Sequence, residues 1–155
     1  LGSSAAAILD APGHTVGHIA YYFAGAGALF SADSLMVMGC GRLFEGTPEQ
    51  MWSTLSRMAA LPDGTLVYSG HEYAASNMRF ALSVDPDNPA LQARAAEIEA
   101  LRAEGRPTVP APIELERATN PFLRAADPAL RARLGLSQAG DADVFAEVRR
   151  RKDAF

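Results

Sequence analysis

Histidine, cysteine and lysine are scarce in this chain of 155 residues, which has three histidines, one cysteine and one lysine. Because Cys40 has no partner in the chain, no intrachain disulfide can form, and we expect a reducing, cytoplasmic setting. Apolar runs of transmembrane length and signal-peptide patterns are also absent, so we expect no membrane partner. The net charge of −4 gives no reason to expect nucleic acid.

The amino terminus lacks the usual features of a natural start. The first residue is Leu1 rather than methionine, and the apolar stretch of residues 5–9 follows almost at once. Natural chain ends are usually polar and easily frayed. We therefore expect a polypeptide entered partway through a sheet, with a short engineered or proteolysed start as the alternative.

Short apolar stretches between glycine-marked turns predict strands in the first half of the chain. The predicted strands cover residues 5–9, 19–23, 28–31 and 65–68. Residues 34–46 contain several glycines and are expected to be irregular. The first half is thus predicted to be built around a sheet.

Helix signals dominate the remainder. Thr47 as N-cap, Pro48 at the first helical position and Gln50 as the capping-box partner predict a helix that ends at the Pro-Asp-Gly turn of residues 62–64. Beyond residue 75 we find no convincing strand. The helices predicted there cover residues 74–84, 89–104, 128–134 and 143–152, with a proline-rich link at residues 107–112. We therefore divide the chain into a β/α part, residues 1–75, and a helical part, residues 76–155.

Residues of metal-ligand type follow three of the strand-like stretches. His14 lies after a Pro-Gly turn, Asp33 ends an apolar run, and His71 follows Ser-Gly. Loops held by rigid strands are where metal centres are commonly built, so we interpret these residues as ligands. Taken alone, Asp33 fits a turn cap equally well. For His18, which precedes a β-rich run, we favour a structural role.

Five segments, taken in order, point to one family. They are residues 12–18 (Pro-Gly-His-Thr-Val-Gly-His), 30–35 (Phe-Ser-Ala-Asp-Ser-Leu), 39–46 (Gly-Cys-Gly-Arg-Leu-Phe-Glu-Gly), 69–73 (Ser-Gly-His-Glu-Tyr) and 148–155 (Val-Arg-Arg-Arg-Lys-Asp-Ala-Phe). Together they resemble the carboxy-terminal part of the glyoxalase II, or hydroxyacylglutathione hydrolase, family of the metallo-β-lactamase superfamily. The resemblance covers essentially the whole chain. It implies an α+β fold: the second half of an αββα sandwich followed by an all-helical, substrate-binding domain.

The resemblance also implies roles for individual residues. His14 would bind one divalent ion and His71 a second, with Asp33 bridging both as the catalytic carboxylate; zinc is the first choice, with iron or manganese as alternatives. The implied contacts to glutathione come from Arg42, Phe44, Tyr73, Arg149 and Lys152. Arg149 and Lys152 lie three apart on a helix and would grip the glycyl carboxylate. Without the resemblance, these two read as a solvated basic helix end.

The expected reaction is metal-dependent hydrolysis of glutathione thioesters, such as S-D-lactoylglutathione, to glutathione and D-lactate. The family's first ligand cluster, Thr-His-x-His-x-Asp-His, is missing, so we expect a fragment that is inactive alone. It would need the missing amino-terminal part of the fold or self-association. The alternatives are another hydrolase or a sulfur dioxygenase of this superfamily, or a non-catalytic glutathione-binding module.

Overall fold

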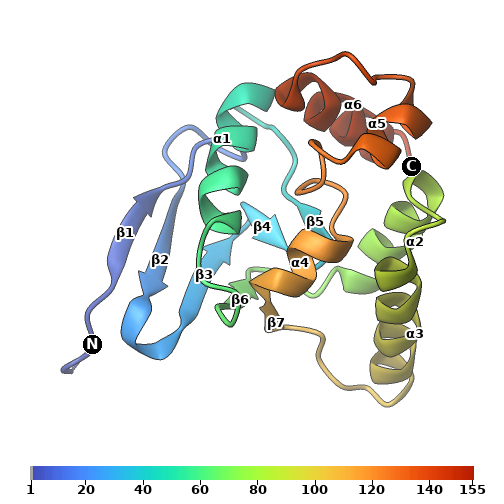
Figure 1. Ribbon diagram of the computed structural model, residues 1–155. Helices are drawn as coiled ribbons and strands as arrows, with labels where there is room; N and C mark the ends of the chain where they lie inside the picture. Colours follow the sequence, from blue (N-terminus) through green and yellow to red (C-terminus); the bar gives the residue numbers. More distant parts are fainter. Residues whose placement is uncertain (1) are drawn as a thin grey trace.

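A mixed five-stranded sheet organises the first half of the chain in the computed structural model, which describes residues 2–155 (Figure 1). Its strands, in spatial order, are β1 (Ala7–Asp10), β2 (Ile19–Phe23), β3 (Ala28–Ala32), β6 (Leu66–Ser69) and β7 (Ala111–Pro112). β2 runs antiparallel to both β1 and β3, β6 runs parallel to β3, and β7 runs antiparallel to β6. A separate two-stranded hairpin comprises β4 (Leu35–Met36) and β5 (Gly39–Cys40).

Six α-helices complete the described chain. They are α1 (Pro48–Ala59), α2 (Ala74–Val84), α3 (Pro89–Ala103), α4 (Ile113–Thr119), α5 (Pro128–Leu134) and α6 (Asp141–Asp153), with a short 3₁₀ turn, η1 (Ala24–Ala26). In Figure 1, α1 lies beside the sheet, and the later helices gather on the side away from β1 and β2. None of the helices in residues 2–155 is both long and apolar enough to span a membrane.

The main core lies between α1 and one face of the sheet. Leu29 of β3 and Val67 of β6 are fully buried against a cluster that includes Met51 and Leu55 of α1. Phe145 of α6 belongs to the same cluster, which joins the sheet to the last helix. The period-two alternation of the strands therefore buries one face of the sheet under α1.

The opposite face of the sheet is uncovered over four strands. Ile8, Tyr21, Phe30 and Tyr68 are directly opposite one another across β1, β2, β3 and β6. Ile8 is 65% exposed, Tyr21 43% and Phe30 45%, and the Phe30 and Tyr68 rings stack with centroids 4.9 Å apart. We call these four residues the Ile8–Tyr21–Phe30–Tyr68 row. A continuous apolar row of this kind is unusual on an exposed protein surface and is typical of a surface that another element covers.

Most predicted elements are confirmed, and three have the predicted bounds. The strand at residues 19–23 and the helices at 74–84 and 128–134 are observed as predicted. The capping box of α1 forms, since the Thr47 hydroxyl accepts from the Gln50 N–H and the Gln50 side chain accepts from the Thr47 N–H. These elements are specified by local capping and propensity, which act without the rest of the fold.

The expectation of no strand after residue 75 is wrong. Ala111 pairs with Val67, and Pro112 with Leu66, so the proline-rich link returns to form an edge strand. A two-residue strand is too short to show periodicity. The same segment leads into α4, whose N-cap, Pro112, has no capping side chain. Residues 34–46, expected to be irregular, contain the β4–β5 hairpin.

A buried carboxylate on α4 holds the turn of that hairpin. Glu116 is fully buried, and its Oε2 accepts from the Met38 N–H at 2.8 Å and from the Asn120 side chain at 3.0 Å. Asn120 also donates to the carbonyls of Met36 and Gly39. Met38 has a φ of +55°, a strained value for a residue with a side chain. Burial raises the pKa of Glu116 to about 7, against the opposing effect of these hydrogen bonds.

We expect Glu116→Gln to flatten the pH dependence of stability. Native Glu116 keeps its proton to a higher pH than the unfolded side chain, whose pKa is near 4.5. Its contribution to stability is therefore full below pH 4.5 and is lost as the pH rises to about 7, by about 3 kcal/mol at most. Urea unfolding between pH 4 and 8, followed by circular dichroism, would measure the slope. Glu114→Gln, an exposed position on the same helix, is the control; an unchanged slope in Glu116→Gln would contradict the prediction.

Candidate active site

The strand directions bring His14, Asp33 and His71 to one edge of the sheet. β1, β3 and β6 all run in the same direction, so the residues that follow them emerge at the same edge. Asp33 directly follows β3, His71 lies two residues after β6, and His14 lies in the loop after β1. His14 and His71 are 57 positions apart in the sequence. The shared direction of the three strands is what makes them neighbours.

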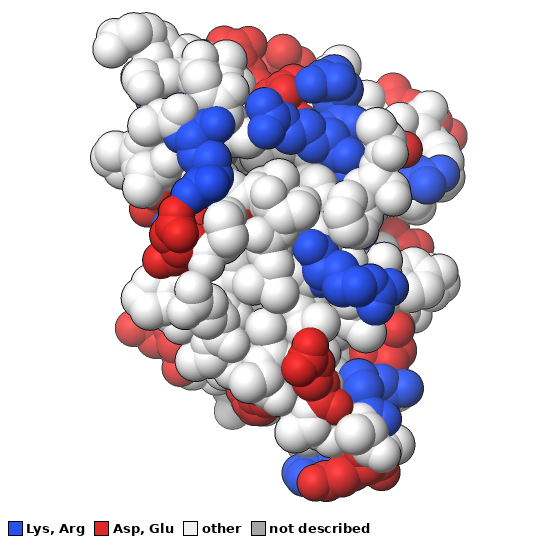
Figure 2. Space-filling view, turned by 90° about the vertical axis from the view of Figure 1, so that its right-hand side faces the viewer, with Lys and Arg blue, Asp and Glu red and all other residues white. Residues whose placement is uncertain are grey.

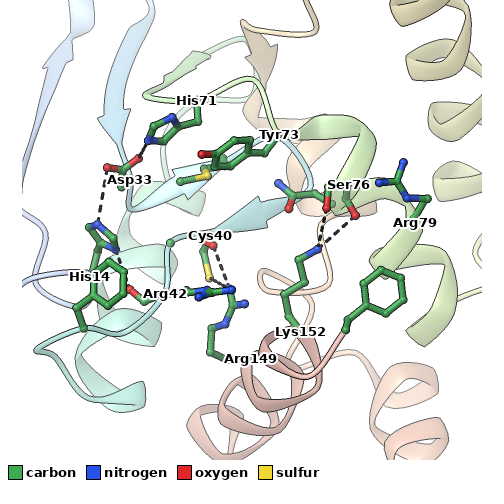
Figure 3. Close-up of a pocket in the computed structure, with 15 residues that line it drawn as sticks. His14, Asp33, Cys40, Arg42, His71, Tyr73, Ser76, Arg79, Arg149 and Lys152 are labelled. Carbon is green, nitrogen blue, oxygen red and sulfur yellow. Dashed lines mark hydrogen bonds and ion pairs between the residues drawn. The ribbon is translucent and has the colours of Figure 1, made fainter.

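Asp33 lies between the two histidines, with one carboxylate oxygen toward each (Figure 3). His14 Nε2 is 3.7 Å from Asp33 Oδ2, and His71 Nε2 is 3.3 Å from Asp33 Oδ1. The other ring nitrogen of His14, Nδ1, is 2.8 Å from the Arg42 carbonyl oxygen. A carbonyl only accepts, so His14 Nδ1 carries the proton, and in the neutral ring Nε2 presents a lone pair toward Asp33.

This arrangement fits divalent metal ions. A lone pair on a neutral imidazole and a carboxylate oxygen are both acceptors, so facing each other they call for a cation between them. Asp33 Oδ1 is buried without a hydrogen-bond partner. A ligating histidine typically donates its second N–H to a carbonyl, as His14 does to Arg42. Residues 2–155 do not, however, bring three His, Cys, Asp or Glu side chains around a single ion.

A cavity of about 880 Å³ opens from these three residues toward α2 and α6. All eight residues that the sequence singled out line it: His14, Asp33, Arg42, Phe44, His71, Tyr73, Arg149 and Lys152. Their roles as ligands and substrate contacts remain predictions. Sequence reasoning missed the contributions of α2 to the lining, namely Ser76, Asn77 and Arg79. Arg79 lies one turn after Ser76, and this i, i+3 spacing was the only available signal.

Gly41 allows the loop after β5 to approach the ligands closely. Its N–H donates to the Asp33 carbonyl at 2.9 Å. A side chain at this position would overlap that carbonyl and the His14 ring. Two rings pack against the histidines: Tyr73 stacks flat on His71 at 4.7 Å between centroids, and Phe44 lies 5.0 Å from His14. The wall of the cavity thus also orients the imidazoles.

His18 and Glu72 are turned away from this centre. His18 meets the His14 ring edge-on, and its Nε2 is buried without a hydrogen-bond partner. The Glu72 carboxylate accepts hydrogen bonds from the backbone and hydroxyl of Thr108. That bond ties the loop before α4 to the loop after β6. The two adjacent side chains therefore diverge, His71 toward Asp33 and Glu72 toward Thr108.

The far end of the cavity is cationic. Arg149 is 5% exposed and donates to the Cys40 carbonyl at 3.1 Å and to Asp153 at 2.8 Å. Lys152 donates to the Ser76 carbonyl at 3.3 Å, and its ammonium lies 5.2 Å from each of two phenylalanine rings, those of Phe80 and Phe155. Burial, followed by the charges of Arg149, Arg79 and Arg42, lowers the pKa of Lys152 to about 8.

The comparisons with known proteins agree over the whole chain. Residues 72–155 match the family model described as hydroxyacylglutathione hydrolase C-terminus, and residues 2–71 match that of the metallo-β-lactamase superfamily. The chain is 64% identical over 155 residues to the hydroxyacylglutathione hydrolase of Ruegeria pomeroyi, and 57% identical to that of Maricaulis maris. Both matches cover all of this chain, and 61% and 60% of those proteins respectively.

Solved structures of two other proteins resemble this chain in fold. ETHE1 from Myxococcus xanthus matches with a TM-score of 0.58 and 24% identity, over 96% of this chain and 46% of that one. TTHA1623, solved in a di-iron-bound form, matches with a TM-score of 0.51 and 26% identity, over 76% of this chain and 42% of that one.

Family and fold follow from these matches together with the sheet and its helical extension. The predicted α+β fold is confirmed, and membership in a family of metallo-β-lactamase type implies a divalent metal cofactor. The chain spans about three fifths of the length of the curated relatives it matches. It belongs to the hydroxyacylglutathione hydrolase family of the metallo-β-lactamase superfamily.

Proposed function

We propose that this chain provides the substrate pocket and part of the metal centre of a glutathione thioester hydrolase. The substrate class is represented by S-D-lactoylglutathione, which is cleaved to glutathione and D-lactate. One observation carries the proposal: a single cavity connects the His14–Asp33–His71 edge to a cationic end. A glutathione thioester is an elongated molecule with a reactive carbonyl and carboxylates at a distance from it, which this cavity matches. The relatives' names support the same reaction.

The metal centre in this proposal has Asp33 as the bridging ligand. His14 would hold one divalent ion and His71 the other; zinc is the first candidate, with iron or manganese as alternatives, and the di-iron form of TTHA1623 makes iron a serious one. When bound, such ions supply a hydroxide at neutral pH and polarise the thioester carbonyl. Overall one water molecule would be consumed: its oxygen would join the acyl carbon in place of sulfur, the C–S bond would break, and its two hydrogens would be shared between the released acid and the thiol of glutathione.

The chain's own residues would orient the substrate along the cavity. Tyr73 and Phe44 pack against the histidines, so in this proposal they would contact the substrate near the thioester. Arg42 would contact the peptide backbone of glutathione. Arg149 and Lys152, at the cationic end, would serve the glycyl carboxylate. In this proposal the distance between the two ends of the cavity sets which thioesters react.

We also propose that a further polypeptide segment completes the centre. His14 and His71 give each ion one histidine and a share of Asp33, whereas catalytic zinc usually has three protein ligands. The uncovered Ile8–Tyr21–Phe30–Tyr68 row would receive the same segment, supplied in cis, by a partner chain or by a second copy. Cys40 is buried, and burial raises the pKa of its thiol to about 11, which disfavours the reactive thiolate at neutral pH.

The test of the proposed function uses an extended chain. The amino-terminal segment of the Ruegeria pomeroyi relative that this chain does not match would be joined ahead of residue 1. With added zinc, iron or manganese, we expect hydrolysis of S-D-lactoylglutathione at about 1–1000 per second, the ordinary enzyme range. A β-lactam and a glutathione persulfide are the control substrates. Oxygen consumption with the persulfide, in place of thioester hydrolysis, would favour a sulfur dioxygenase. Glutathione binding without any turnover would favour a binding module.

A further inference from the structure

The segment from Met36 to Arg42 connects the turn of the β4–β5 hairpin to the candidate metal centre. Near the end of this segment, the Gly41 N–H donates to the Asp33 carbonyl at 2.9 Å, and the Arg42 carbonyl oxygen is 2.8 Å from His14 Nδ1. The orientation of the His14 ring, and with it the direction of the Nε2 lone pair, therefore depends on where the segment places one carbonyl.

Two buried side chains hold the other end of the segment, Glu116 on α4 and Asn120 directly after that helix. Asn120 donates to the carbonyls of Met36 and Gly39, at 3.2 Å and 3.0 Å. The Met38 N–H donates to Glu116 Oε2 at 2.8 Å, and Asn120 donates to the same oxygen at 3.0 Å. Both side chains are fully buried and lie outside the set of residues that line the cavity.

Every residue of the segment 36–42 has a backbone polar group engaged by a residue outside the hairpin. Between the contacts described above, Asn77 of α2 donates to the Val37 carbonyl at 3.0 Å, and Arg149 of α6 donates to the Cys40 carbonyl at 3.1 Å. A segment held at each residue has little freedom to adjust locally. A displacement at its turn is therefore transmitted to its far end, beside the metal ligands.

The position of Glu116 is costly for a carboxylate. Figure 2 shows Asp and Glu side chains on one face of the molecule, where water solvates them. Glu116 has no exposed surface, and among residues 2–155 its Oε1 is buried without a hydrogen-bond partner. A buried polar atom without a partner destabilises the folded state. The presence of an acceptor at this position therefore indicates that it serves to place the hairpin rather than to form the most stable core.

We propose that Glu116 and Asn120 are positioning residues for the candidate metal centre, acting through residues 36–42 and the Arg42 carbonyl that orients His14. The inference rests on the proposed function for the metal centre. It gives the helical part of the chain a role in a site whose proposed ligands all come from the β/α part. Neither Glu116 nor Asn120 touches an ion or the substrate, so their loss should affect metal affinity and kcat more than KM.

A matched pair of substitutions in the extended chain tests the proposal. Glu116→Gln keeps an acceptor for the Met38 N–H, whereas Glu116→Met has a similar volume and no acceptor. Glu116→Met should weaken zinc binding about tenfold and lower kcat for S-D-lactoylglutathione about tenfold, the usual effect of losing an outer-shell partner, with KM changed by less than about threefold. Glu116→Gln should stay within about threefold of the unchanged protein in all three quantities. Competition with a chromogenic chelator measures the zinc affinity.

Two further variants separate positioning from a general loss of stability. Asn120→Ser keeps an acceptor for the Phe122 N–H but is too short to reach the two hairpin carbonyls. It should reproduce the effects of Glu116→Met, and it provides the test if Glu116→Met does not fold. Leu130→Ala, at a fully buried position on α5, is the control. It should lower the melting temperature and, when assayed well below that temperature, leave zinc affinity and kcat unchanged.

Three results would overturn the assignment. Equal losses in Glu116→Gln and Glu116→Met would show that the acceptor is not what matters. Unchanged zinc affinity in both Glu116→Met and Asn120→Ser would remove the link to the metal centre. A rise in KM alone would place the effect on substrate binding.

Zinc binding is measured without substrate, which distinguishes failure of this inference from failure of the proposed function. Weaker zinc binding in Glu116→Met, in an extended chain that does not hydrolyse thioesters, would support the positioning role and reject the hydrolase. Thioester turnover together with unchanged zinc affinity in Glu116→Met would do the reverse. An extended chain that does not bind zinc would reject both.

Discussion

Asp33→Ala in the extended chain should lose both bound metal and thioester hydrolysis, with kcat/KM falling by about a thousandfold or more. Both histidines face this one carboxylate, at 3.7 Å and 3.3 Å, so its removal leaves each of them without an anionic co-ligand. Metal-bound hydroxide and carbonyl polarisation each contribute several kcal/mol to such a reaction, and about 1.4 kcal/mol corresponds to a factor of ten. Metal content by elemental analysis and hydrolysis rate should therefore decrease together.

Asp33→Asn is the companion variant, since it keeps the shape of the side chain and removes its charge. It should retain the fold, as judged by circular dichroism, and still lose most of the metal. Asp10→Asn, at an exposed carboxylate that ends β1, serves as the control and should keep full metal and activity. Full metal loading and normal activity in Asp33→Ala would show that this aspartate is only a turn cap.

The isolated chain should self-associate and show no measurable turnover, whereas the extended chain should be monomeric and active. The reason is the apolar row of Ile8, Tyr21, Phe30 and Tyr68, which crosses four strands on the side of the sheet that α1 does not cover. Exposed apolar sheet surfaces pair with other chains. Size-exclusion chromatography with light scattering would compare the two proteins, and the hydrolysis assay would be run on the same fractions.

Lysine substitutions within the row test its role directly. Tyr21→Lys with Phe30→Lys should reduce self-association of the isolated chain, since charge on an exposed sheet opposes pairing. The same pair of changes in the extended chain should destabilise it, because both side chains would then be covered. Val16→Lys, at an apolar position 56% exposed and outside the row, is the control. A monomeric isolated chain with ordinary turnover would refute the need for a further segment.

The sequence alone was sufficient wherever the signal is local. The capping box of Thr47 and Gln50 marked the start of α1, and β-rich composition marked β2, because caps and propensities act within a few residues. The residues at the strand ends, His14, Asp33 and His71, were likewise identified from glycine-marked turns and from the family resemblance. Their assignment as metal ligands is the prediction that the Asp33 variants test.

Only the tertiary structure decided what depends on contacts between distant segments. β7 forms because Ala111 and Pro112 pair with β6. A segment of two residues is too short for its sequence to predict such a pairing. The same holds for the cations of the cavity. Arg149 and Lys152 look equivalent because they lie on one helix. However, Arg149 bonds to Asp153 and to the Cys40 carbonyl, whereas Lys152 bonds to Ser76 of α2. Sequence spacing defines which side chains share a helix face, whereas packing between helices determines which charges remain free to bind a ligand.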